Sequence, residues 1–354
     1  MDVTISEILL TPIKQPLKLP FKTSLQHVKE REAILVTVIS NEALKGYGEC
    51  VAFSTPWYTE ETITGCRFVM ENVLIPLLNG ETLDGPEEVT GRFSQVKGNR
   101  MAKAAIEMAV WDLFAKKKES PLWQMVGGSG EAVEAGVVVA ADEAEIAGRV
   151  EAAVAKGYSR IKIKINPATN KELLKNIVSS YPDTLFFADA NGAFDETNFN
   201  QLKQFDSIGL ALIEQPFGEQ EWQLHARAKL EMKTAICLDE SIKSFEDVER
   251  MIFEQAGDII VLKMGRLGGW SETLRIVEIC QKHSIGMWVG GMIEFGVSKA
   301  HNLALASLPG ITLPGDFSDS GHFWERDIIV PEIKVADGNI ELSKKHGIGY
   351  DIQL

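Results

Sequence analysis

Charged residues recur at a nearly constant interval through the second half of this chain of 354 residues. Lys164, Asp189, Glu214, Asp239 and Lys263 follow one another at intervals of 25, 25, 25 and 24 residues. Each lies in the last residues of an otherwise apolar stretch, which is typical of a buried strand. Because one strand, one helix and two short loops fill such an interval, the spacing predicts a series of βα units.

Short apolar stretches alternate with polar, helix-compatible segments throughout this region. The stretches are GVVVA (136–140), RIKIKI (160–165), TLFFADA (184–190), LALIEQP (210–216), TAICLDE (234–240), DIIVLKM (258–264) and GMWVGG (286–291). Strands that alternate with helices form a parallel sheet, and seven or eight such units favour a closed barrel over an open sheet. We therefore predict an α/β fold with a TIM-type barrel.

The first 130 residues have a different pattern of apolar and polar residues. Between Val3 and Tyr47, IKQPLKLPF is broken by prolines and AILVTVIS is a continuous apolar run, which together predict a small antiparallel sheet. The segment MAKAAIEMAVWDLFAKK then predicts a helix, whose buried stripe would contain Ala105, Met108, Ala109 and Leu113. This change in sequence pattern predicts a separate α+β domain over residues 1–130.

Composition limits the classes of partner. A net charge of -14 argues against nucleic acid, whose binding needs clustered basic charge. No run of eighteen apolar residues and no basic segment before an apolar N-terminal stretch is present, so we expect no membrane association and a cytoplasmic location. The cysteines, Cys50, Cys66, Cys237 and Cys280, lack CxxC spacing and are expected to be reduced thiols.

The regularly spaced charged residues predict an active site. The carboxyl ends of barrel strands open onto one face, so five ionisable side chains would surround one mouth. A single acidic strand end is more often a helix cap, but three carboxylates brought together raise one another's pKa values unless a cation compensates them. Their oxygen ligands favour Mg²⁺, with Mn²⁺ as a substitute.

The two lysines, Lys164 and Lys263, would then lie on opposite sides of the mouth. Each could remove a proton from a carbon next to a substrate carboxylate, provided that its pKa is lowered toward neutrality. Lys162 and Arg266, each together with the metal, are expected to lower the pKa values of Lys164 and Lys263, respectively. Arg160, deeper in the same strand, is assigned no chemistry.

The motifs around these residues resemble those of the muconate-lactonizing-enzyme subgroup of the enolase superfamily. They are KIK (162–164), DAN (189–191), EQP (214–216), DES (239–241) and KMGRLGG (263–269), together with LPFKTS (19–24) and GYGECVAFSTPWYTEE (46–61) near the N-terminus. The resemblance implies a modified (β/α)7β barrel over residues 131–320. It also implies an α+β capping domain over 1–130, with substrate-specificity loops near 19–24 and 50–60, and a segment 321–354 that returns to the cap.

The resemblance also implies roles for particular residues. Asp189, Glu214 and Asp239 would bind Mg²⁺, and Lys164 and Lys263 would be the acid/base pair. Further residues are expected to contact the substrate or to support these groups. They are Lys162, Asn191, Glu240, Arg266, Gly291, Met292, Ile293, Tyr58 and Phe21.

The segment 288–320 is similar to the o-succinylbenzoate synthase and N-succinylamino acid racemase family. This implies dehydration of 2-succinyl-6-hydroxy-2,4-cyclohexadiene-1-carboxylate to 2-succinylbenzoate in menaquinone biosynthesis, or racemisation of N-succinylamino acids. The partner would be a small carboxylate substrate, and a homo-oligomer is compatible with the sequence.

Three alternatives remain at this point. Dipeptide epimerases have Asp-x-Asp at the eighth strand, where this chain reads Asp316-Phe317-Ser318, and the missing second carboxylate disfavours a substrate ammonium. A lactonizing or sugar-acid enzyme would share the first chemical step. A non-catalytic binding relative is disfavoured by the intact lysines and carboxylates.

Overall fold

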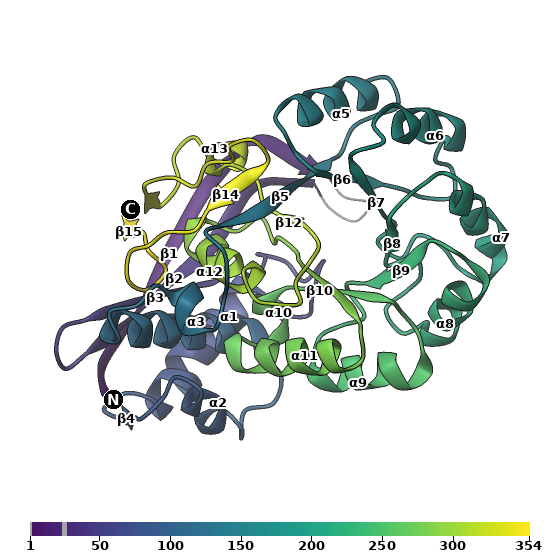
Figure 1. Cartoon of the computed structure of the whole chain (residues 1–354). Coiled ribbons are helices and arrows are strands. Elements are labelled where there is room, and N and C mark those ends of the chain that lie inside the picture. Colours follow the sequence, from purple (N-terminus) through teal and green to yellow (C-terminus); the bar gives the residue numbers. More distant parts are fainter. Residues whose placement is uncertain (1, 23–26) are drawn as a thin grey trace.

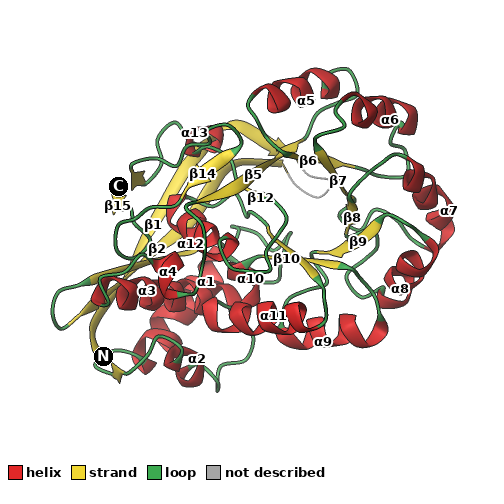
Figure 2. Ribbon diagram, viewed as in Figure 1, coloured by secondary structure: helices red, strands yellow, loops and turns green. Residues whose placement is uncertain are grey.

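The structure is a computed structural model that describes residues 2–22 and 27–354. The side chains of Leu19, Phe21, Lys22 and His27 also lie outside the described part, so the predicted substrate contact of Phe21 stays a prediction. An antiparallel sheet with helices packed beside it adjoins a ring of strands surrounded by helices (Figures 1 and 2). The predicted fold class, a barrel with a capping domain, is confirmed.

The cap sheet has the strand order β3-β2-β1-β4. Its strands are β1 (Val3–Lys22), β2 (His27–Ser40), β3 (Lys45–Cys50) and β4 (Thr82–Leu83). The expected interruption at the prolines of IKQPLKLPF is wrong, because β1 continues through them. Since β4 pairs only with Val3 and Thr4, the rest of β1 has β2 alone as a partner, and an edge strand tolerates residues without an N–H donor.

Helix α3 (Arg100–Lys117) packs directly on β3. A Cβ at Gly46 or Gly48 would lie 2.0 Å from the carbonyl oxygen of Ala109 or Ala105, so only glycine permits this approach. The predicted stripe of α3 is buried, but burial extends around most of the helix and includes Glu107 and Asp112. The smaller cap elements are α1 (Ile63–Val69), η1 (Met70–Leu74), η2 (Ile75–Leu77), α2 (Glu88–Arg92) and α4 (Leu122–Met125).

The barrel strands follow the order β11-β10-β9-β8-β7-β6-β5-β12, with parallel pairing along this path. They are β5 (Ala132–Val139), β6 (Arg160–Lys164), β7 (Leu185–Asp189), β8 (Leu212–Glu214), β9 (Ala235–Leu238), β10 (Ile259–Leu262), β11 (Gly286–Val289) and β12 (Gly315–Asp316). Each strand is short, so Asp239 and Lys263 lie one residue beyond their strands rather than inside them.

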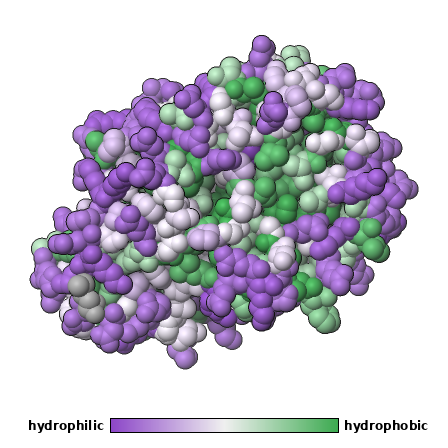
Figure 3. Space-filling model, in the orientation of Figure 1, coloured by the Kyte–Doolittle hydropathy of each residue, from purple (hydrophilic) through white to green (hydrophobic). Residues whose placement is uncertain are grey.

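Helices surround this ring of strands, as Figure 1 shows. They are α5 (Ile146–Ala155), α6 (Lys171–Ser180), η3 (Glu196–Asn198), α7 (Phe199–Leu202), η4 (Lys203–Ser207), α8 (Trp222–Glu231), α9 (Phe245–Glu254), α10 (Met264–Leu267), α11 (Trp270–Lys282) and α12 (Gly296–Ala306). Figure 3 shows polar residues around the rim of one face and apolar residues toward its centre. None of the helices in the described part is long and apolar enough to span a bilayer.

The barrel interior contains its own apolar cluster, formed by Phe187, Leu212, Cys237, Val261 and Trp288. These residues come from five successive strands, β7 to β11, and every one is fully buried. Strand side chains alternate between the two faces of a sheet, so the residue two positions further along each strand points into the barrel again. The apolar cluster is therefore a floor, with functional side chains in the next layer toward the mouth.

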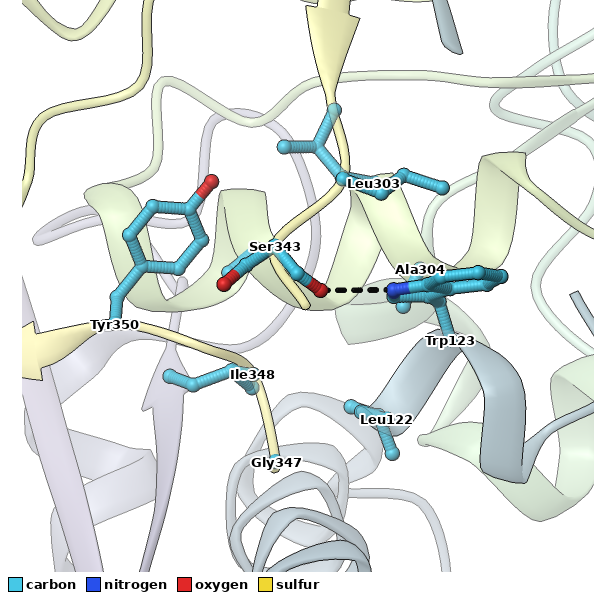
Figure 4. A pocket seen from close by; sticks show the side chains of 10 residues that line it. Leu122, Trp123, Leu303, Ala304, Ser343, Gly347, Ile348 and Tyr350 are labelled. Carbon is cyan, nitrogen blue, oxygen red and sulfur yellow. Dashed lines mark hydrogen bonds between the residues drawn. The ribbon is translucent and has the colours of Figure 1, made fainter. Parts of the chain in front are cut away.

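The C-terminal segment contacts both domains. Its elements are α13 (Ser320–Phe323), β13 (Ile329–Val330), β14 (Asn339–Glu341) and β15 (Asp351–Ile352). Strand β14 pairs with β5 of the barrel, and Leu122 N donates to Gly347 O at 2.7 Å. A small pocket lies in this seam between α4 and α12, where Trp123 Nε1 donates to Ser343 O at 2.8 Å (Figure 4).

Candidate active site

Strand β6 directs three cations into the barrel. Arg160 and Lys162 are buried, and their charged groups lie over aromatic rings of the floor. Arg160 Nη1 lies 2.6 Å and Lys162 Nζ 2.9 Å from the carboxylate of Asp316, at the end of β12. The sequence offered no signal for this pairing, because strands β6 and β12 are more than 150 residues apart and meet only when the barrel closes.

Lys164 stands at the mouth, above these two cations. Its Nζ donates to Asp189 Oδ2 at 2.6 Å and to Asn191 Oδ1 at 2.6 Å. Asn191 has a positive φ of 43°, and its amide donates to Glu240 Oε1 at 2.9 Å. The side chain of Lys164 is 28% exposed, so a group on a substrate can reach it.

Lys263 stands on the other side of the barrel, since β6 and β10 are four strands apart in the ring. Its Nζ donates to Asp239 Oδ2 at 2.7 Å and to Tyr58 Oη at 2.7 Å. Arg266 Nη1 donates to the same two residues, at 2.5 Å to Asp239 Oδ1 and at 2.6 Å to Tyr58. Tyr58, which comes from the cap, therefore bonds to the predicted base itself.

The three predicted metal-binding carboxylates lie on neighbouring strands. Asp189 and Glu214 are direct partners in the β7–β8 register, and Asp239 follows β9, the next strand. Lys162 lies among them, with Nζ 3.1 Å from Glu214 Oε2 and 3.6 Å from Asp189 Oδ2. The pKa of Glu214 is well above its usual range because the carboxyl group is buried and faces the charge of Asp189.

The pKa values of two neighbouring carboxyl groups, Asp239 and Glu240, shift in opposite directions. Burial opposes the ionisation of Asp239, but Arg266 and Lys263 outweigh it and hold its pKa below the usual range. Burial, together with the charges of Asp239 and Asp189, raises the pKa of Glu240 to about 7. Negative charge therefore accumulates at one place in the mouth, and cationic side chains compensate part of it.

Arg266 by itself does not lower the pKa of Lys263, and the expected lowering by Arg266 together with the metal stays a prediction. Burial and Arg266 both act in the lowering direction, yet the carboxylate of Asp239 outweighs them and raises the pKa of Lys263. The charges of Asp316, Glu214 and Asp189 likewise outweigh burial and raise the pKa of Lys162. The two shifts have one physical cause, which is that each lysine lies closer to a carboxylate than to another cation.

The donor chemistry of this site suits a hard divalent cation. Asp189, Glu214 and Asp239 offer only oxygen atoms, and buried Glu214 Oε2 receives no hydrogen bond of acceptable geometry despite its proximity to Lys162. No three His, Cys, Asp or Glu residues of the described chain are arranged as a metal-ion site, and lysines bond to oxygens of Asp189 and Asp239. The residues present thus fit the ion by chemistry and by neighbouring position.

The loop after β11 borders the same mouth. A Cβ at Gly290 would lie 2.8 Å from Lys263 Cε, so the chain passes directly beside that lysine. Met292 and Ile293 are buried, and Ile293 has a φ of 55°, which is a strained conformation for a β-branched residue. Contacts between this loop, including Gly291, and a substrate stay a prediction.

Comparisons with known proteins place this chain among relatives of similar length. Residues 5–127 match the family model for the mandelate racemase / muconate lactonizing enzyme N-terminal domain, and residues 145–354 match the enolase C-terminal domain-like model. An o-succinylbenzoate synthase from Geobacillus stearothermophilus is 42% identical, with 99% of this chain and 94% of that protein covered. An N-succinylamino acid racemase from Thermus thermophilus is 40% identical, with 97% and 93% covered.

Solved structures of related proteins have the same fold as this chain. An enolase superfamily member from Listeria innocua has a TM-score of 0.95 at 37% identity, covering 99% of this chain and 95% of that one. A muconate lactonizing enzyme from Pseudomonas fluorescens has a TM-score of 0.92 at 22% identity, covering 99% and 97%, which shows a shared fold.

Proposed function

The chain belongs to the mandelate racemase and muconate lactonizing enzyme family of the enolase superfamily, and we propose that it is an o-succinylbenzoate synthase. Among relatives that match nearly the whole chain, o-succinylbenzoate synthases from Geobacillus stearothermophilus and Bacillus subtilis are each 42% identical. The observation that carries the proposal is the placement of Lys164 and Lys263 on opposite sides of one barrel mouth, with carboxylates between them.

The proposed reaction removes water from 2-succinyl-6-hydroxy-2,4-cyclohexadiene-1-carboxylate. Lys164 takes the proton from the carbon next to the substrate carboxylate and the carbon–carbon double bond forms. The hydroxide that leaves the neighbouring carbon takes this proton from Lys164 and departs as water, which restores the neutral lysine. Lys162 is fully buried below Lys164 and keeps its positive charge, so it stabilises the negative charge that develops on the substrate carboxylate.

A divalent cation completes the proposed site. Asp189, Glu214 and Asp239 would hold Mg²⁺, or Mn²⁺ in its place, and the ion would supply electrophilic stabilisation of the substrate carboxylate. These oxygens are the ones that Lys164, Lys162 and Lys263 now contact. A ligand that engages Asp239 would weaken the interaction that raises the pKa of Lys263, which favours the neutral, basic form of that lysine.

Racemisation of N-succinylamino acids is the second candidate. It is favoured by the second lysine, because Lys263 can return a proton to the face opposite Lys164. The 40% identical relative from Thermus thermophilus is named for this activity. Dipeptide epimerisation is disfavoured because the carboxylate of Asp316 is engaged by Arg160 and Lys162, which leaves it poorly placed to bind a substrate ammonium.

The test is a parallel assay of the cyclohexadiene substrate, a set of N-succinylamino acids and a set of dipeptides. Each assay is run with Mg²⁺ and again with excess chelator. We expect formation of 2-succinylbenzoate that depends on the metal. Turnover of dipeptides without turnover of either succinyl substrate would overturn the proposal. The proposed setting is the cytoplasm, with a small carboxylate as the partner and no nucleic acid or membrane.

A further inference from the structure

A buried arginine of the cap joins the two loops that border Lys263. Arg31, in β2, is 1% exposed. Its Nη1 donates to Ala52 O at 2.7 Å and its Nη2 donates to Val51 O, at the start of the cap loop that leads to Tyr58. Its Nε donates to Ile293 O at 3.3 Å, in the barrel loop after β11. One guanidinium group therefore donates hydrogen bonds to backbone carbonyl groups of both the cap and the barrel.

Burial of the Arg31 guanidinium group costs desolvation free energy. Among the described residues the group forms no ion pair, and every donor contact recorded for it ends on a backbone carbonyl. The ring of Phe53 lies 4.1 Å from the guanidinium carbon. Burial of this cation costs stability, and Glu49 and Glu294 offset part of the cost through space without forming an ion pair with it among the described residues.

Both backbone segments held by Arg31 are in contact with Lys263 or its helix. On the cap side, Gly265 lies against Val51, since a Cβ on Gly265 would come within 2.6 Å of Val51 Cγ2. Lys263 is the N-cap residue of that helix, α10. On the barrel side, the loop held at Ile293 begins at Gly290, which lies against the Lys263 side chain.

Further hydrogen bonds to neighbouring residues fix the strained backbone at Ile293. Glu49, also from the cap, accepts from Phe295 N at 2.8 Å and from Ser298 N at 2.9 Å. Glu294 accepts from Met292 N at 2.5 Å. Strained backbone of this kind persists where its surroundings fix it, and it is concentrated at functional sites.

We propose that Arg31 is a positioning residue for Lys263, which it braces through Val51 on one side and through the 290–295 loop on the other. Among the described residues, which leave out 23–26 of the cap, the hydrogen-bond partners of Lys164 are Asp189 and Asn191, and both belong to the barrel. Loss of the brace should therefore affect one of the two bases. This inference rests on the proposed function only where substrates are used in its test.

The main experiment measures exchange of the α-proton in D₂O. Both enantiomers of N-succinylphenylglycine are incubated with the wild type and with Arg31→Lys, which keeps the charge but loses the planar fork of donors. The Lys263→Ala variant identifies which enantiomer Lys263 serves. We expect Arg31→Lys to slow exchange of that enantiomer at least about tenfold more than exchange of the other, because small displacements of a base have large rate effects.

A matched control separates positioning from general loss of stability. Asp112→Asn alters a fully buried carboxylate that joins Tyr47 N and Ile348 N and contacts neither loop. This variant should slow α-proton exchange of both enantiomers equally or not at all. Equal slowing of both enantiomers by Arg31→Lys, or no slowing, would overturn the proposal. If Arg31→Lys does not fold, Val51→Ala removes the methyl group that packs against Gly265 and should show the same bias.

A second measurement needs no substrate. Amide hydrogen exchange in Arg31→Lys should increase in residues 51–58 and 290–298 together, and not in these peptides of Asp112→Asn. An increase in one segment alone would contradict the linkage. If the wild type exchanges neither enantiomer, the racemase chemistry fails, and this measurement still decides whether Arg31 couples the two loops.

Discussion

Lys164 and Lys263 face each other across the barrel in different surroundings. Lys164 Nζ lies 2.6 Å from Asp189 and its side chain is 28% exposed, whereas Lys263 Nζ lies 2.7 Å from Asp239 and its side chain is 8% exposed. Among the described residues of the cap, Tyr58 bonds to Lys263 and not to Lys164. The two bases should therefore respond differently to changes in the cap.

Replacement of Lys164 by alanine should abolish turnover of the cyclohexadiene substrate. The variant loses the proposed base but no residue of the apolar core, so its circular dichroism spectrum and its binding of Mg²⁺ should remain close to those of the wild type. Formation of 2-succinylbenzoate, followed by absorbance, measures the effect. Substantial residual turnover would show that Lys164 is not the base.

Mg²⁺ should raise the melting temperature of the wild type, and a chelator should reverse the rise and abolish turnover. A ligand that binds only the folded state stabilises it by mass action. The Glu214→Gln variant should lose most of this Mg²⁺-dependent rise because a neutral amide is a poorer ligand. Glu249→Gln, at an exposed position of α9, is the control and should keep it. An unchanged rise in Glu214→Gln would place the ion elsewhere.

The Asp316→Asn substitution should destabilise the barrel strongly. It leaves Arg160 and Lys162 buried without the carboxylate that both now contact. Removal of one partner from a buried ion pair typically costs about 3–5 kcal/mol in the free energy of unfolding. Urea unfolding measures the cost. Asp351→Asn, which breaks an exposed pair with Lys345, should cost less than about 1 kcal/mol.

Two buried histidines should oppose folding as the pH falls. Burial lowers the pKa of His225 and of His301 to about 4, from an ordinary value of 6.5. Between these values both side chains bind protons in the unfolded chain but not in the folded chain, so their contribution to the free energy of unfolding falls as the pH drops from 6.5 to 4. Each histidine should contribute about 3 kcal/mol to this fall, whereas buried carboxyl groups with raised pKa values, such as Glu49, act in the opposite direction. Urea unfolding should therefore show His225→Gln gaining about 3 kcal/mol relative to the wild type as the pH drops across that range, and a constant difference between the two proteins would refute the assignment.

The Gly290→Ala substitution should slow the racemisation of N-succinylamino acids, which uses Lys263, and overpacking against buried Val261 should also cost about 1–3 kcal/mol in stability. The added methyl group would lie 2.8 Å from Lys263 Cε and 2.5 Å from Val261 Cγ1, and the flexible lysine is the group that can move. Displacement of a base by about 1 Å can lower the rate by about 100-fold. Gly218→Ala is the matched control, since its nearest recorded neighbour would be Glu221 Cγ at 3.5 Å. Equal turnover in the two variants would contradict the prediction.

The barrel and the arrangement of its mouth were predictable because they follow from local periodicity. Each βα unit repeats the same length, so Asp189, Glu214 and Asp239 had to reach one end of one sheet. The direction of the Lys263 pKa shift was not predictable from neighbours in the sequence. It depends on Asp239, which is 24 residues away along the chain and 2.7 Å away in space.

The sequence by itself determined the fold class, the family and the ring of five ionisable residues, because strand period and helix length act over short stretches of chain. Only the tertiary structure decided which charges pair. Arg160 meets Asp316 because the barrel closes, and Tyr58 and Arg31 meet the mouth because the cap docks on it. Such contacts depend on how distant segments pack, and pairwise electrostatic energies change steeply with the distances that packing fixes.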